Sequence, residues 1–182
     1  MKVTPCPLDG LLLIEPTVFG DQRGFFVESW NRQRYRDAGI ALDFVQDNFS
    51  WSCRGTLRGM HFQNPMPQGK LVSVWHGEVW DVAVDLRRRS PTFGRWFGVT
   101  LSAENKRQFF APPGFAHGFV VLSENALFHY KCTEFYSAKD ELGFCWDDPA
   151  VGIAWPPVAS PILSSRDAAS PRLADIPPDR LF

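Results

Sequence analysis

The segment VQDNFSWSCRGTLRGMHFQNPMPQGK, from Val45 to Lys70, gathers side chains that can do chemistry within one loop and two expected strands. Its polar members include Gln46, Asn48, Ser50, Arg54, Arg58, His61, Gln63, Gln68 and Lys70. Histidine titrates near neutrality, so His61 between Arg58 and Lys70 can serve as a general base while the two cations hold an anionic ligand. The alternative is a histidine that donates one ring N–H to a backbone carbonyl and has no chemical role. The density of polar groups in so short a segment favours the general base.

A second histidine stands in Pro112-Pro-Gly-Phe-Ala-His117, which fits the P-x-G-x-x-H pattern of metal-binding cupins. Those proteins carry His-x-His on an earlier strand, whereas this sequence has His61-Phe-Gln63, and an amide is a poor substitute for imidazole on a transition metal. We therefore expect no bound metal. Instead, His61 and His117 are predicted to line a polar cavity in which Lys70 and Arg58 supply the positive charge.

Such a cavity suits proton abstraction from a carbon next to a carbonyl group. A base removes the proton, and a fixed cation stabilises the enolate that forms. General base catalysis contributes on the order of 10² to 10⁴ in rate, and one oxyanion donor roughly 3 to 4 kcal/mol. Inversion of the carbon also requires a proton donor on the opposite face, for which Tyr130 in a predicted strand is the candidate. The alternative for Tyr130 is a packed tyrosine whose hydroxyl is bonded elsewhere.

The elements that must position these groups are predicted to be strands. A chain of 182 residues fits one domain, residues 1–182, and its 15 prolines and 14 glycines favour many turns and few long helices. Expected strands cover residues 11–14, 25–30, 43–48, 71–76, 79–86, 96–101, 107–111, 118–122 and 127–135. Their short, regular spacing is typical of a β-sandwich or barrel. Asn31 is expected to cap one short helix, Arg32–Ala38, that ends before Gly39.

Two further features concern the strands themselves. The turn His76-Gly77-Glu78 predicts that residues 71–76 and 79–86 form a β-hairpin. In the second of these strands Asp81 and Asp85 share one face, so one of them could point into a cavity; the alternative is a carboxylate on a solvent-exposed face. After Trp146 the chain is rich in proline, and we expect an irregular but ordered tail that wraps the barrel.

Charge and composition exclude several classes of protein. The net charge is −1, and the one basic run, Arg87 to Arg89, precedes Ser90-Pro91 and is interpreted as a solvated turn, so no nucleic-acid partner is expected. The four cysteines show neither paired nor zinc-type spacing, which indicates free thiols in a reducing compartment. No apolar run has the length of a signal core or a membrane span. We expect a cytoplasmic protein with no membrane partner.

Taken together, the motifs of the chain resemble those of the dTDP-4-dehydrorhamnose 3,5-epimerases, which are cupin-fold enzymes. The matching segments, in chain order, are FGDQRGFFVE (19–28), QDNFS (46–50), LRGMHFQ (57–63), QGK (68–70), DVAVD (81–85), SPTFG (90–94), PGFAHGF (113–119) and WDD (146–148). The resemblance covers essentially the whole chain. It implies an all-β fold, a cupin-type jelly-roll β-barrel with one short N-terminal helix and an irregular C-terminal tail.

The resemblance also implies roles for individual residues. His61 would remove the C5 and C3 protons, with Asp167 as its dyad partner; Lys70 would stabilise the enolate at the C4 oxygen, and Tyr130 would return a proton from the far side. Neither a metal nor a nicotinamide cofactor would be required. Arg58, His117 and Arg23 would hold the diphosphate and sugar, Gln46, Asn48 and Glu28 would bind the deoxythymidine, and Phe19, Phe26 and Tyr136 would stack on thymine. Some of these residues would come from the second subunit of a homodimer.

The family often has two adjacent tyrosines where this chain has Phe135-Tyr136, so one hydroxyl is missing near the expected nucleotide pocket. Three alternatives to a double epimerase stay open. A single-centre (3- or 5-) epimerase of another nucleotide 4-keto-6-deoxysugar would use the same proton chemistry. A metal-dependent cupin enzyme would need a second ligand where Gln63 stands. A nucleotide-sugar binding module without turnover would tolerate the loss of His61.

Overall fold

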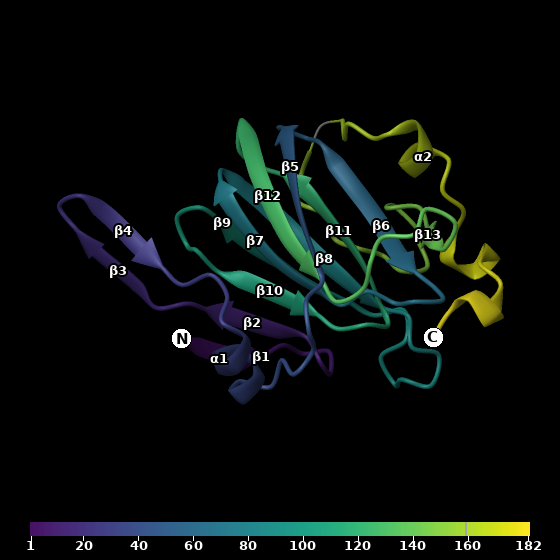
Figure 1. Ribbon diagram of the computed structural model, residues 1–182. Helices are drawn as coiled ribbons and strands as arrows, with labels where there is room; N and C mark the ends of the chain where they lie inside the picture. Colours follow the sequence, from purple (N-terminus) through teal and green to yellow (C-terminus); the bar gives the residue numbers. More distant parts are fainter. Residues whose placement is uncertain (159) are drawn as a thin grey trace.

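The computed structural model describes residues 1–158 and 160–182, and it consists mainly of two antiparallel β-sheets that face each other (Figure 1). One sheet has the strand order β1-β2-β10-β7-β12-β5, formed by Lys2–Pro5, Leu12–Glu15, Gln108–Ala111, Lys70–His76, Asn125–Cys132 and Gln46–Cys53. The other has the order β13-β6-β11-β8-β9, formed by Glu141–Gly143, Leu57–Gln63, Phe115–Val121, Glu78–Asp85 and Trp96–Ser102. The predicted all-β class is confirmed.

The main core fills the space between the two sheets. Val72 and Val74 of β7 and Phe128 of β12 pack there against Ala83 of β8 and Phe119 of β11. All five side chains have exposures of 4% or less, so inner-facing side chains on these strands lie within a dense apolar layer. A polar group on an inner face therefore needs a partner within the protein or access to a cavity.

The prediction that residues 71–76 and 79–86 form a hairpin is wrong. β7 pairs with β10 and β12, whereas β8 pairs with β11 and β9 in the other sheet. Gly77 lies between them with φ +72°, and a Cβ there would lie 2.0 Å from the carbonyl oxygen of Asn125. The tight turn is real, but it carries the chain from one sheet to the other because both faces of β8 are buried.

Near the N-terminus the chain forms a separate hairpin and the expected helix. β3 (Val18–Asp21) pairs with β4 (Gly24–Val27), and this β3–β4 hairpin projects away from the two sheets in Figure 1. The predicted strand 25–30 is shorter in the structure, where β4 ends at Val27. Helix α1 (Arg32–Asp37) begins after Asn31, whose side chain accepts a hydrogen bond from the Arg34 N–H, so the predicted cap is confirmed.

The C-terminal tail contains three short helical turns and packs on the outer face of the five-stranded sheet. The turns are α2 (Ser165–Ala168), η1 (Leu173–Asp175) and η2 (Pro178–Arg180), drawn in yellow in Figure 1. Val151, Leu173 and Ile176 of the tail contact Met60 and Val82 on the sheet. The tail is thus ordered against the barrel, as predicted. None of the described helices is long and apolar enough to cross a membrane.

Candidate active site

His61 and Asp167 form a hydrogen-bonded pair although 106 residues separate them in the chain. His61 lies on β6 and Asp167 on α2, with 2.6 Å between His61 Nε2 and Asp167 Oδ1. The turn that carries Asp167 is capped by Ser164, whose hydroxyl accepts a hydrogen bond from the Asp167 N–H at 3.0 Å. An ionised carboxylate can only accept, so Nε2 donates and Nδ1 keeps the lone pair that a base requires.

An irregularity in β6 aligns His61 with Arg58. Strand β11 pairs His117 with His61 and Phe119 with Arg58, so two residues of β11 span three residues of β6. Such a bulge places Arg58 and His61 on the same face, although strict alternation would have separated them. Gly59 is required there, because its φ is +135° and a Cβ would lie 2.7 Å from the Gly118 Cα.

A cavity of about 270 Å³ lies beside His61 and brings several predicted residues together. Its lining residues are Gln46, Asn48, His61, Gln68, Lys70, Tyr130, Cys132, Tyr136 and Glu141. Lys70 Nζ stands 5.8 Å from the centroid of the Tyr130 ring. The base, the cation and the proton donor of the predicted chemistry therefore share one hollow, to which β5, β6, β7, β12 and β13 contribute.

Burial and hydrogen bonding shift the pKa values of three groups in this site. Burial lowers the pKa of Lys70 because an ammonium group loses its water there. Burial also raises the pKa of Tyr130, so the phenol keeps its proton. Burial opposes ionisation of Asp167, but the hydrogen bond from His61 and smaller contributions outweigh it, and the pKa of Asp167 is lowered. The pair thus holds an ionised carboxylate against a histidine whose side chain is 26% exposed.

The polar row of β5 is fixed at the rim of the cavity. Gln46 donates a hydrogen bond to Asn48 Oδ1 at 2.9 Å and accepts one from the Tyr136 N–H at 2.8 Å. Tyr136 in turn donates its hydroxyl to Glu141 Oε2 at 2.8 Å, and Arg166 also binds this carboxylate. The amides and the exposed Tyr136 ring therefore keep fixed positions through bonds to several elements.

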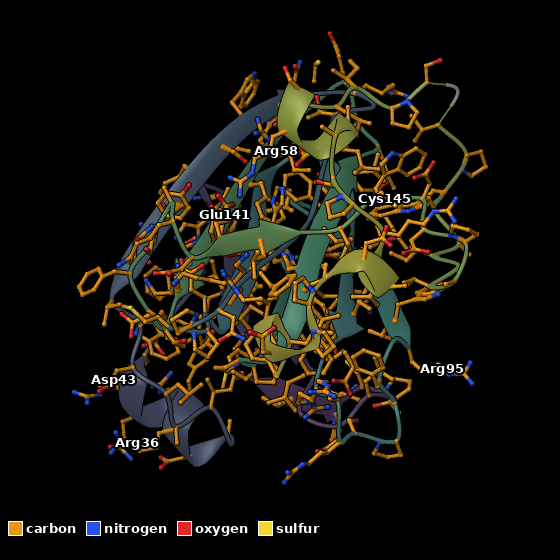
Figure 2. The ribbon with its side chains drawn as sticks, turned by 90° about the vertical axis from the view of Figure 1, so that its right-hand side faces the viewer. Arg36, Asp43, Arg58, Arg95, Glu141 and Cys145 are labelled. Atoms are coloured by element: carbon orange, nitrogen blue, oxygen red, sulfur yellow. The ribbon has the colours of Figure 1, made fainter. Side chains whose placement is uncertain are left out.

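A second hollow of about 370 Å³ lies next to His61 and contains Arg58, Arg166 and Asp167. The Arg58 guanidinium donates to Ser52 Oγ through Nε at 3.2 Å and through a terminal nitrogen at 3.1 Å. Figure 2 shows Arg58 and Glu141 close to the α2 turn that carries Arg166. Two guanidinium groups therefore lie beside the histidine pair, where they can attract an anionic ligand.

Not every predicted site residue lies in this cavity. His117 is buried and directs Nε2 to both oxygens of Asp81, at 2.9 Å each. Asp81 and Asp85 both have 0% exposure, so the solvent-exposed alternative is wrong for each of them. Asp85 binds Arg87 and the hydroxyls of Ser90 and Thr92 and stabilises a turn, which includes the start of the basic run.

Four of the predicted site residues, on the β3–β4 hairpin and directly after it, lie away from the cavity beside His61. Phe19 and Phe26 are 62% and 67% exposed on the β3–β4 hairpin. Arg23 forms an ion pair with Asp21 at 2.5 Å, and Glu28 pairs with Arg34 at 3.1 Å. A single copy of the chain does not bring these four residues to the cavity beside His61.

The position of Gln63 has a structural explanation. Its amide donates to the carbonyls of Met66 and Phe135 at 2.7 and 3.0 Å, and its oxygen accepts from the Ser137 N–H at 2.9 Å. The side chain thus fixes the loop that precedes β13. Across the described part of the chain, no three His, Cys, Asp or Glu side chains are grouped so that they could hold a metal ion.

Sequence reasoning missed four residues of the site. Cys132 could have been found, because it follows Tyr130 by two positions in one strand and therefore shares its face. Arg166 directly precedes Asp167 and could have been suspected with it. Glu141 and Ser164 gave no signal, since β13 has three residues and the α2 cap lies in an aperiodic tail.

The known proteins that this chain resembles bear on the same site. The family model described as dTDP-4-dehydrorhamnose 3,5-epimerase matches residues 5–175. The chain belongs to this family. It is 54% identical over 176 residues to the family member of Pseudomonas aeruginosa, with 96% of this chain and 97% of that protein covered.

Two solved structures relate the family to its ligands. A dTDP-6-deoxy-D-glucose-3,5-epimerase from Legionella pneumophila, in complex with dTDP-4-keto-L-rhamnose, has a TM-score of 0.97 and 52% identity and covers 99% of this chain and 96% of its own. A 3'-monoepimerase from Streptomyces bikiniensis, in complex with dTDP-quinovose, has a TM-score of 0.88 and 36% identity, with coverage of 93% and 87%. The first agreement confirms the predicted cupin-type fold.

Proposed function

We propose that this chain is a dTDP-4-dehydrorhamnose 3,5-epimerase, an isomerase that inverts C3 and C5 of dTDP-4-dehydro-6-deoxy-D-glucose. The observation that carries the proposal is the 2.6 Å contact between His61 and Asp167 at the wall of a cavity that also contains Lys70 and Tyr130. Membership of the family at 54% identity supports the same conclusion.

The geometry supports the following steps. His61 Nδ1 removes the proton from C5, and the electron pair of the C–H bond moves into an enolate at the C4 oxygen. The Lys70 ammonium stabilises that oxygen, and the Tyr130 hydroxyl gives a proton to the opposite face of C5. Solvent then reprotonates Tyr130 and takes the proton from His61, after which the same sequence inverts C3.

The nucleotide part of the substrate is assigned to the polar groups around the cavity. Gln46 and Asn48 would bind the thymine base, on which Tyr136 would stack, and Arg58 would bind the diphosphate together with His117. His117 would make this contact with the diphosphate and sugar from a buried position, where it is also bonded to Asp81. The four free cysteines fit the reducing cytoplasm that the sequence predicts.

We further propose that the active form is a homodimer in which the β3–β4 hairpin of one subunit completes the site of the other. Phe19, Phe26 and Arg23 are exposed on a hairpin that projects from the body of the chain (Figure 1), and Glu28 follows directly after it. Exposed aromatic side chains of this kind are expected to be covered by a partner. The proposal predicts that mixed His61→Ala and Arg23→Ala subunits regain roughly a quarter of the wild-type activity, because half of the dimers are mixed and each has one intact site.

The activity itself is tested by incubating dTDP-4-dehydro-6-deoxy-D-glucose with the protein in deuterated water and analysing the product by NMR. Deuterium and inversion at both C3 and C5 are expected. Inversion at one centre would favour the single-centre epimerase, an alternative kept because a 3'-monoepimerase with a TM-score of 0.88 shares the fold. No exchange at either carbon in the folded protein would overturn the proposal.

A further inference from the structure

A second histidine–aspartate pair, Asp81–His117, lies deeper in the same barrel and is not explained by the steps above. Asp81 has 0% exposure, and both of its oxygens lie 2.9 Å from His117 Nε2. Burying an ionisable pair is expensive, and apolar residues of similar volume would often stabilise a core equally well. A buried ionisable pair of this kind is therefore a candidate for a functional role.

The neighbours of this pair connect it to the catalytic cavity. Next to His61 on the sheet, His117 lies with its ring stacked over Phe128 at a centroid distance of 6.1 Å and an interplanar angle of 29°. Phe128 also contacts the Tyr130 ring, with centroids 5.9 Å apart. The aromatic contact thus runs from His117 to the proposed proton donor.

Asp81 also faces the strand that carries the proposed oxyanion-stabilising lysine. On β8 it lies between Val79 and Ala83, which pack into the inter-sheet core. On β7, Lys70 precedes Val72 by two positions and so shares the face with which Val72 enters that same core. The carboxylate and the ammonium therefore approach the core from opposite sheets.

We propose that Asp81 is a positioning residue that acts through Lys70: its buried carboxylate, held in place by His117, keeps the Lys70 side chain charged and directed into the cavity. This inference rests on the proposed function, because it assigns Lys70 to the enolate oxygen. Burial raises the pKa of Asp81, and the charges of His117 and Lys70 oppose that rise, which fits mutual support among the three groups.

The other groups around Lys70 do not replace this carboxylate. The titratable and charged side chains that face it are Cys132 and Tyr130 of β12, Glu141 of β13, His61 of β6 and Asp81 of β8. Burial raises the pKa values of Cys132 and Tyr130, so both are neutral at pH 7. Glu141 already binds Arg166 and the Tyr136 hydroxyl. Glu141 acts on Lys70 more strongly than Asp81 does, but its charge is already balanced by Arg166. Among the described residues, Asp81 is the carboxylate near Lys70 whose ion-pair partner is a histidine and not an arginine.

The test is the pH dependence of turnover in Asp81→Asn. Removing a nearby negative charge disfavours the ammonium form of Lys70, so the alkaline limb of kcat should move to lower pH by about one unit or more. Asp85→Asn is the matched control: the residue lies on the same strand and is equally buried, but it binds Arg87 and two hydroxyls. We expect Asp85→Asn to be less stable than the wild type, but the alkaline limb of its kcat should stay at the wild-type pH.

Two further measurements cover the remaining cases. If Asp81→Asn does not fold, His117→Gln can replace it, because it removes the group that keeps Asp81 ionised. The alkaline limb of kcat should again move to lower pH. An NMR titration of the Lys70 side chain in the variant and in the wild type reads the same shift without turnover, so it remains informative if the proposed reaction fails. An alkaline limb and a Lys70 titration unchanged from the wild type, in whichever variant folds, would overturn the inference.

Discussion

The two histidine–aspartate pairs of the barrel have the same chemistry and different surroundings. In the pair on the cavity wall, the His61 side chain is 26% exposed and Asp167 4%; in the inner pair, His117 is 7% exposed and Asp81 0%. Of the two histidines, only the outer one lines the cavity that the proposed substrate would enter. Exposure, rather than pairing with a carboxylate, therefore distinguishes the proposed base from the inner histidine.

The two aspartates of these pairs are positioned by different elements of the fold. Asp81 is part of β8, so the sheet itself brings it to β11. Asp167 comes from the α2 turn of the tail, and its position depends on the Ser164 cap and on the packing of residues such as Leu173. The outer pair is therefore expected to respond to changes in the tail, and the inner pair to changes in the core.

The largest expected effect that distinguishes the pairs is that of Asp167→Asn. The variant keeps the shape of the side chain but no longer favours the tautomer in which His61 Nδ1 is the base, so exchange of the substrate hydrogens should fall roughly a thousandfold at all pH values. Deuterium incorporation measured between pH 6 and 9 checks this. A shift of the alkaline limb without a general loss of rate would mean that the two pairs have been assigned the wrong way round.

Tyr130→Phe should have a smaller and more selective effect. The base still removes the proton, but the far face of the carbon loses its donor, so inverted product should fall roughly a hundredfold while deuterium exchange with retention persists. The ratio of inversion to exchange is the measurement. Tyr35→Phe is the control, because the Tyr35 hydroxyl is bonded to Gln108 in a separate cluster, and its loss should leave the ratio unchanged. Equal losses of exchange and inversion in Tyr130→Phe would contradict the assignment.

The smallest expected effect concerns a buried carboxylate that is paired with a cation instead of a histidine. Burial opposes ionisation of Asp85, but hydrogen bonds from Arg87 and two hydroxyls outweigh it and lower the pKa of Asp85 to about 2. A lowered pKa stabilises the fold above the ordinary carboxyl pKa, and this contribution is lost as the pH falls towards 2. Asp85→Asn should therefore lower the free energy of unfolding at pH 7 by about 2 kcal/mol.

Urea unfolding of both proteins at pH 7 and near pH 2.5 measures this contribution. The difference in the free energy of unfolding between the wild type and Asp85→Asn should be smaller at the lower pH. The activity of the variant at pH 7 should be unaffected. A gap that does not change with pH would mean that Asp85 does not contribute through its charge.

The sequence predicted the parts of the site that depend on residue type and strand alternation. His61, Lys70 and Tyr130 lie around one cavity, and Gln46 and Asn48 share a face of β5 as alternation requires. Only the family resemblance suggested Asp167, because no local pattern links residues 106 positions apart. The bulge that aligns Arg58 with His61 was equally invisible, since it depends on the close approach of Gly59 and Gly118.

The errors in the predicted fold have a common physical cause. A tight turn at Gly77 has the same local sequence whether the next strand pairs with the previous one or joins the opposite sheet, and burial on both faces of β8 decides the outcome. Burial against the outer face of the sheet likewise fixes the proline-rich tail, which could be predicted as ordered but not as helical at α2.

The most direct test of the account is the rate at which deuterium enters C5 of the substrate in His61→Ala, with and without added imidazole. The account predicts a loss of exchange on the order of 10² to 10⁴, retained binding of dTDP, and partial recovery when imidazole fills the space left by the side chain. His76→Ala, which changes an exposed histidine stacked on Trp51, is the matched control and should exchange like the wild type. A folded His61→Ala protein that exchanges C5 hydrogen at the wild-type rate would contradict the account.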